Sequence, residues 1–132
     1  MITRTASCRC GALVARCEGE PVRVSACHCL ACQQRSGSAF AVQARWPVEQ
    51  VTLTGDRREW TRVADSGGTS TSRFCPTCGA TVAYDNSSFP GLLAVPVGAF
   101  ADPAFPPPRF SVWEHRKHPW LEITGAGVEH SD

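Results

Sequence analysis

Seven of the eight cysteines fall in three short clusters, and these are the residues best suited to chemistry. The clusters are Cys8-Arg9-Cys10-Gly11, Cys27-His28-Cys29-Leu30-Ala31-Cys32 and Cys75-Pro76-Thr77-Cys78-Gly79. Two thiolates separated by two residues, as in the third cluster, converge on a metal ion while backbone amides point at the sulfurs. The spacing of the cysteines therefore predicts metal binding.

Two of the clusters together supply the four ligands that a structural zinc ion takes in tetrahedral geometry. Cys8 and Cys10 give one pair and Cys75 and Cys78 give the other. This site would join the N-terminal segment to a turn 65 residues after Cys10, and closing so long a loop stabilises a small β domain. Iron also suits four sulfurs, but zinc is the expectation because no redox partner motif accompanies the cluster.

The remaining cluster offers only Cys27, Cys29 and Cys32. Three protein ligands with one open position are typical of a reactive zinc ion. Three thiolates make zinc electron-rich and a poor Lewis acid, so it acidifies bound water less than a three-histidine site does. Such a site is suited to holding an incoming thiol as thiolate for attack on a small electrophile. The cluster thus predicts sulfur chemistry rather than peptide or ester hydrolysis.

Two neighbouring residues leave alternatives open. His28 or Cys17 could complete the second site as a purely structural one, whereas disulfides fit the C-x-C and C-x-x-C spacing less well. His28 could shuttle a proton to or from the thiol near neutral pH, or simply hydrogen-bond to the backbone. Cys17 alternates with Leu13 and Ala15 in a strand pattern, which predicts that it packs as a small buried hydrophobe.

Length and composition limit the class of protein that carries these clusters. The chain has 132 residues, 42% of them hydrophobic and 19% charged, which is typical of one globular domain. Thirteen bases against twelve acids argue against a dedicated nucleic-acid or membrane-surface protein. We find no pattern of a signal peptide and no run of 18 apolar residues. We therefore expect a cytoplasmic location, where thiols stay reduced.

The elements that position the clusters are expected to be mostly strands. Twelve Val and ten Thr against six Leu favour strands over helices. Alternating runs bounded by turn formers predict strands at 12–18, 22–26, 39–46, 51–54, 59–63, 81–84 and 92–97. One short helix is expected over 30–36, with Gly37 at its C-terminal cap, and prolines exclude regular structure over 101–108. The fold class is thus mainly β, with short antiparallel strands.

Tryptophans and basic residues outside the clusters also have expected places in the fold. Trp46 and Trp60 end strand patterns and are expected in the core. The basic segment between Trp113 and Trp120 is expected to be a solvated loop anchored by these two tryptophans, with a binding patch as the alternative. Arg35 could meet an anionic substrate group, although an ordinary exposed arginine fits its position equally well.

Four motifs in this order resemble the glutathione-dependent formaldehyde-activating enzyme (GFA) family, which shares its domain with centromere protein V. They are Cys8-Arg9-Cys10-Gly11, Cys27-His28-Cys29-x-x-Cys32, Ser36-Gly37-Ser38-Ala39-Phe40 and Phe74-Cys75-x-x-Cys78-Gly79. The similarity continues through Val97-Gly98-Ala99-Phe100-x-Asp102-Pro103 and Val112-Trp113 to Pro119-Trp120. It covers nearly the whole chain, so we expect a single zinc-binding GFA-type domain over residues 1–132.

The resemblance implies an Mss4-like β-tent stapled by zinc. It implies a structural zinc on Cys8, Cys10, Cys75 and Cys78 and a second, labile zinc on Cys27, Cys29 and Cys32. From its position between two of these ligands, we expect His28 to join the three cysteines as a catalytic residue. The implied activity is that of a carbon–sulfur lyase, which condenses formaldehyde with glutathione to S-hydroxymethylglutathione. The implied partners are a small thiol and a small carbonyl compound.

The chain departs from the family pattern at two places. Cys17 is not required by that pattern, and Gln33-Gln34-Arg35 stands where relatives often carry a more basic stretch. Fewer positive charges there weaken the case for a carboxylate-rich thiol such as glutathione. A non-catalytic zinc-binding module or thiol carrier is therefore the alternative to the enzyme. No nucleic-acid partner is expected because the arginines are dispersed, and a homodimer through sheet edges fits a β fold.

Overall fold

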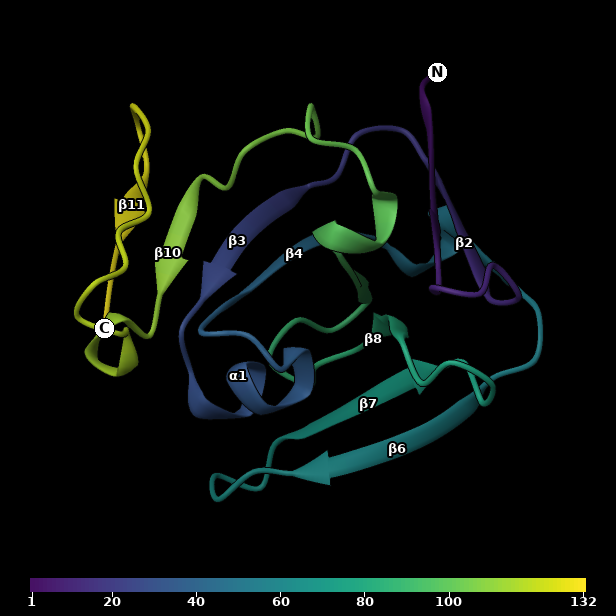
Figure 1. Cartoon of the computed structure of the whole chain (residues 1–132), viewed down its shortest axis with the longest axis horizontal. Helices are drawn as coiled ribbons and strands as arrows, with labels where there is room; N and C mark the ends of the chain where they lie inside the picture. The colour runs from purple at the N-terminus through teal and green to yellow at the C-terminus, as the bar shows by residue number, and fades with distance from the viewer.

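Two β-sheets make up the computed structural model, which describes residues 1–132 (Figure 1). The smaller sheet is antiparallel and has the order β1-β2-β5, with β1 (Thr3–Ser7), β2 (Val14–Glu18) and β5 (Val51–Thr54). The larger has eight strands in the order β11-β10-β3-β4-β9-β8-β7-β6. Figure 1 shows its β10–β11 edge at the left and the β6–β7 hairpin at the bottom, with α1 between them in this view.

The strands of the larger sheet are short and mostly antiparallel. They are β3 (Arg23–Cys27), β4 (Ala41–Pro47), β6 (Arg58–Val63), β7 (Thr69–Phe74), β8 (Thr81–Tyr84), β9 (Leu92–Pro96), β10 (Phe110–Val112) and β11 (Glu129–His130). The helices are α1 (Leu30–Ser36) and the 3-10 turns η1 (Val48–Gln50), η2 (Val97–Phe100) and η3 (Glu114–Arg116). None of these helices has the length and apolar character needed to cross a membrane.

The hydrophobic core lies between the two sheets. Its buried members come from both sheets and the loops beside them: Ala6, Cys8, Leu13, Ala15, Cys17, Val24, Ala44, Trp46, Cys75, Val82, Val95 and Phe105. Trp46 is fully buried, and its indole N–H donates a hydrogen bond of 2.9 Å to the carbonyl of Gly19. The expectations that Trp46 and Cys17 pack in the core are thereby confirmed.

The opposite face of the larger sheet is polar and also buried. Successive side chains of a strand point to opposite faces, so Ser25 and Cys27 of β3 and Gln43 and Arg45 of β4 lie away from the apolar core. All four are nonetheless buried. This second face carries the candidate site, because Cys27 ends β3 and leads directly into α1.

The mainly β fold expected from the sequence is confirmed, and α1 has the expected limits. Gly37 adopts the left-handed conformation at φ 68° that a helix C-cap requires, and its N–H donates to the carbonyl of Gln33. The seven expected strands form within two residues of their predicted ends, and 101–108 contains no helix or strand. The sequence patterns missed β1, β7, β10 and β11.

Two expectations were wrong. The strands are not all antiparallel, because β10 runs parallel to both β3 and β11. Trp60 is not in the core: it is 61% exposed, because β6 is an edge strand and all its side chains are exposed.

Candidate metal centres

Four cysteines from two segments far apart in the chain meet just beyond β1 and β7. The sulfurs of Cys8, Cys10, Cys75 and Cys78 all lie within 4.8 Å of one another. The Cys8–Cys10 and Cys10–Cys75 sulfur distances are 3.7 and 3.6 Å, far longer than the roughly 2.05 Å of a disulfide. A tetrahedron with zinc–sulfur bonds of about 2.3 Å has sulfur–sulfur edges of about 3.8 Å. The donor set therefore fits a zinc ion closely.

Backbone amides around this four-cysteine cluster favour thiolates. The N–H of Leu13 donates to the sulfur of Cys8 at 3.2 Å, and that of Thr77 donates to Cys75 at 3.3 Å. A hydrogen bond from the Ala80 N–H lowers the pKa of Cys78 to about 6. Since the thiolate is the form that binds metal, the local backbone prepares the cluster for a cation.

The second cluster forms where β3 passes into α1. The sulfurs of Cys27, Cys29 and Cys32 lie within 4.8 Å of one another. Cys29 is the N-cap of α1, and its sulfur accepts a hydrogen bond of 3.3 Å from the Cys32 N–H. Hydrogen bonds from the thiols of Cys27 and Cys32 lower the pKa of Cys29, and the bond to Cys29 raises the pKa of Cys27. The thiolate form of Cys29, which is the form that binds metal, is thus favoured by its neighbours.

The two residues considered as a fourth ligand do not join this three-cysteine cluster. Cys17 is fully buried in the apolar core, where burial raises its pKa to about 12. The ring of His28 is fully buried, and its Nε2 makes a hydrogen bond of 2.9 Å with the Ser111 hydroxyl. Neither residue belongs to the group of atoms that could hold one ion.

His28 begins a chain of hydrogen bonds that leads to the surface. The Ser111 hydroxyl donates to Oε2 of Glu114 at 2.7 Å, and Nδ1 of His130 pairs with the same oxygen at 2.7 Å. His130 lies in β11, where Glu114 is its partner. Because β10 carries Ser111, this network fixes the loop of the second cluster to the edge of the sheet.

A glutamine of α1 ties the helix to the segment after η3. The side-chain amide of Gln33 donates to the carbonyls of His28 and Arg116, and its Oε1 bonds His118 at 2.9 Å. The expected anchoring by two tryptophans was wrong: Trp113 and Trp120 are 52% and 73% exposed. Gln33 supplies the attachment instead.

The sequence patterns missed a buried polar group on the same face as Cys27. It consists of Ser25, Gln43, Arg45 and Tyr84. In an alternating strand such polar residues read as solvent-facing, so no local signal marks them as buried. The hydroxyl of Tyr84 and Oε1 of Gln43 are buried without any hydrogen-bond partner.

A mainly β domain with these two cysteine clusters defines a protein that could bind two metal ions, and the donor sets are consistent with zinc. The family description "glutathione-dependent formaldehyde-activating enzyme" matches residues 3–116, and the chain belongs to that family. The resemblance drawn from the motifs, and with it the Mss4-like fold class, is confirmed.

One solved structure is similar along almost the entire chain. It is the crystal structure of a Rhodobacter sphaeroides protein, a Northeast Structural Genomics target, with a TM-score of 0.58 and 17% sequence identity. The similarity covers 97% of this chain and 99% of that one, and it supports the fold. No curated protein matches the sequence significantly.

Proposed function

We propose that residues 1–132 form a single zinc-binding GFA-type domain that adds a small thiol, of the glutathione type, to formaldehyde or a related small carbonyl compound. The observation that carries this proposal is the second cluster, where the sulfurs of Cys27, Cys29 and Cys32 converge and no fourth side-chain ligand atom joins them. The family's description names the thiol and the aldehyde. The reaction belongs to the carbon–sulfur lyase class.

The chemistry needs a thiolate and a carbonyl carbon. A zinc ion bound by the three cysteines would supply a position at which a thiol is held as thiolate. The substrate's S–H bond breaks, a C–S bond forms at the carbonyl carbon, and the carbonyl oxygen takes up a proton to become a hydroxyl. No electron transfer is involved. The proposed role of His28 is to hold the ligand loop in place through its hydrogen bond to Ser111.

The four-cysteine cluster has a separate role in this proposal. Its ligands join two distant segments, so its zinc is structural, whereas the zinc of the three-cysteine cluster is labile. Both need reduced thiols, and all eight cysteines are free in the structure. A reducing location such as the cytoplasm fits this requirement.

The test is the rate of adduct formation from glutathione and formaldehyde with the zinc-loaded protein. We expect a rate above the spontaneous one, lost in Cys29→Ala and kept in the matched control Cys17→Ala, whose thiol lies outside both clusters. Metal analysis should find two zinc ions per chain, one of them readily chelated. No acceleration with any of several thiols, together with one inert zinc, would instead support a non-catalytic zinc-binding module or thiol carrier.

A further inference from the structure

Three arginines near the second cluster have no acidic partner. Arg23, Arg35 and Arg45 make no ion pair, a property that they share with most arginines of the chain. Each of these three guanidinium groups lies over an aromatic ring: Arg23 over Phe110 at 3.9 Å, Arg45 over Phe89 at 4.1 Å and Arg35 over Tyr84 at 4.2 Å. Stacking of this kind orients a guanidinium and leaves its N–H groups available to an anion.

The strand register places two of these groups together. Arg45 of β4 and Tyr84 of β8 both pair with Ala94 of β9, so their side chains rise from one face on either side of a small residue. Arg35 reaches the Tyr84 ring from α1, where it stands three residues after Cys32 and hence on the same helix face. Arg35, Arg45 and Tyr84 therefore form one group beside the three-cysteine cluster.

This group contains buried polar atoms that nothing satisfies. Arg45 is 5% exposed, and the only hydrogen bond of its side chain is a long one of 3.4 Å to the Ser25 hydroxyl. Nη2 of Arg35 and the hydroxyl of Tyr84 are buried without a partner. Burial lowers the pKa of Arg45 and raises the pKa of Tyr84. Native proteins pair nearly all buried polar groups, and an unpaired buried charge is costly, so this set of donors points to an anionic ligand.

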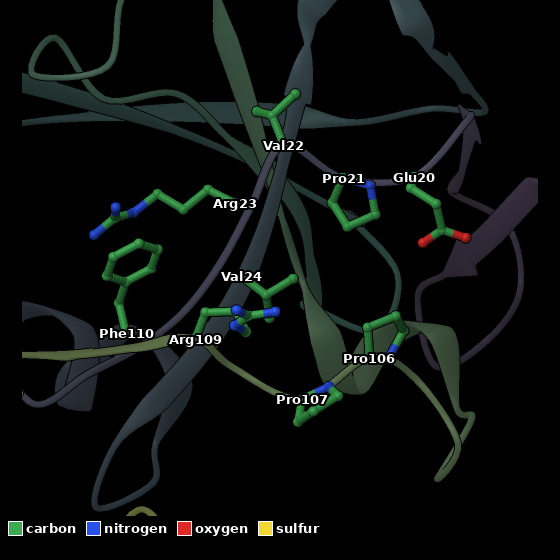
Figure 2. Close-up of a pocket in the computed structure, with 9 residues that line it drawn as sticks. All are labelled: Glu20, Pro21, Val22, Arg23, Val24, Pro106, Pro107, Arg109 and Phe110. Carbon is green, nitrogen blue, oxygen red and sulfur yellow. The ribbon is translucent and has the colours of Figure 1, made fainter. Parts of the chain in front are cut away.

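Arg23 lies outside this group. Figure 2 shows its side chain running over the ring of Phe110, at the rim of a cavity of about 320 Å³ that contains no cysteine of either cluster. Arg23 pairs with Arg45 across β3 and β4, so the positive charge continues across the two strands. We place the binding group at Arg35, Arg45 and Tyr84 because the charges of Arg35 and Arg45 interact with the thiols of the three-cysteine cluster.

We propose that Arg35, Arg45 and Tyr84 bind a carboxylate of the thiol substrate and so select anionic, peptide-sized thiols over neutral ones. The thiol itself rests on the proposed function. Three thiolates around a zinc ion would carry a net charge of −1, so Arg35 and Arg45 leave a surplus of one positive charge, which one carboxylate would neutralise. This proposal differs from the expectation that fewer positive charges at Gln33-Gln34-Arg35 weaken the case for a carboxylate-rich thiol.

The size of the ligand follows from the register. Ala41 pairs with Cys27, and Arg45 lies four residues further along β4, which is about 13 Å along an extended strand. An extended tripeptide spans about 10 Å, and the long arginine side chains can cover the remainder. A thiol of tripeptide size could therefore reach both the sulfurs and the Arg45 guanidinium.

The probe for this site is S-methylglutathione, whose blocked sulfur can neither react nor ionise. We expect zinc-loaded protein to bind it in calorimetric titration, and to bind its dimethyl ester, which lacks both carboxylates, at least about tenfold more weakly. Arg35→Met and Arg45→Met should each weaken binding of the free acid by about tenfold or more. The matched control Arg16→Met removes the same charge from the smaller sheet and should leave binding unchanged.

Circular dichroism and zinc content check that each variant is folded. If Arg45→Met does not fold, the result for Arg35→Met decides the proposal, because Arg35 lies at the surface end of the group. Wild-type affinity in Arg35→Met, equal binding of acid and ester, or no binding of S-methylglutathione overturns the proposal. Arginine-dependent binding without rate acceleration would refute the proposed function and leave the anion site standing. Equal acceleration of glutathione and 2-mercaptoethanol, unchanged in both variants, would refute the site alone.

Discussion

The four-cysteine cluster should stabilise the fold far more than the three-cysteine cluster does. It connects Cys10 to Cys75 across 65 residues, whereas the other cluster spans six residues of one loop. The perturbation is the double substitution Cys10→Ser/Cys78→Ser. Both thiols are exposed, so the change removes one ligand from each arm and leaves the buried Cys8 and Cys75 in the core.

The expected loss follows from the loop that the metal closes. A cross-link across 65 residues lowers the entropy of the unfolded chain enough to stabilise the fold by about 4 kcal/mol. The logarithmic dependence on loop length makes this about 2 kcal/mol more than for a six-residue loop. For 132 residues, a loss of about 4 kcal/mol corresponds to a fall in Tm of about 14 °C.

The assay is thermal and urea unfolding followed by circular dichroism in reducing buffer with zinc. The control is Cys29→Ser/Cys32→Ser, which removes two ligands of the other site and should lower Tm much less. A chelator strong enough to remove both zinc ions from the wild type should bring its Tm to that of Cys10→Ser/Cys78→Ser or slightly below it. Equal losses in the two double variants, or a loss below about 1 kcal/mol in the first, would refute the cross-link.

Three further predictions concern the scaffold. Trp46→Phe removes the N–H that bonds Gly19 in the core and should cost about 1–3 kcal/mol in urea unfolding; an unchanged midpoint would contradict this. Gly55→Ala would bring a Cβ within 1.9 Å of a backbone carbonyl and should cost more than Gly91→Ala, whose Cβ meets open space; equal losses would show that the backbone yields there. The hydrogen bond from His130 lowers the pKa of Glu114 from its ordinary value of 4.5. The contribution of Glu114 to the free energy of unfolding is therefore complete above pH 4.5 and is lost as the pH falls through the lowered pKa. Glu114→Gln should therefore flatten the acid side of the stability curve, and identical curves would disprove this.

The metal clusters and α1 could be predicted because their signals are local. Spacing alone brings Cys75 near Cys78, and the same holds for Cys29 and Cys32 around the start of a short helix that Gly37 ends. The combination of distant clusters also followed from the sequence, since four ligands make one tetrahedral site and three remain. Ligand number supplied a long-range constraint that hydrophobic patterns lack.

The rest of the site could not be predicted, because it depends on contacts between residues far apart in the chain. His28 and Ser111 are 83 residues apart, and β10, which carries Ser111, has only three residues and no alternating pattern. Arg45 illustrates the second reason: its position in an alternating strand reads as exposed, and only the packing of α1 and the Phe89 loop over that face buries it. Trp60 shows the reverse, because no element covers the edge strand β6.

The two faces of the larger sheet depend on each other through the register of β3 and β4. Val24 pairs with Ala44 in the apolar core, and the alternate pair of Ser25 with Gln43 faces the cysteine cluster. A slip of one residue would move Arg45 into the core and bring apolar side chains beside the sulfurs. The core therefore rejects a one-residue slip, which would move the buried arginine to the wrong face. The folding free energy that comes from apolar packing on one face thus sets the geometry of the charged group on the other, without any ion pair to hold that group in place.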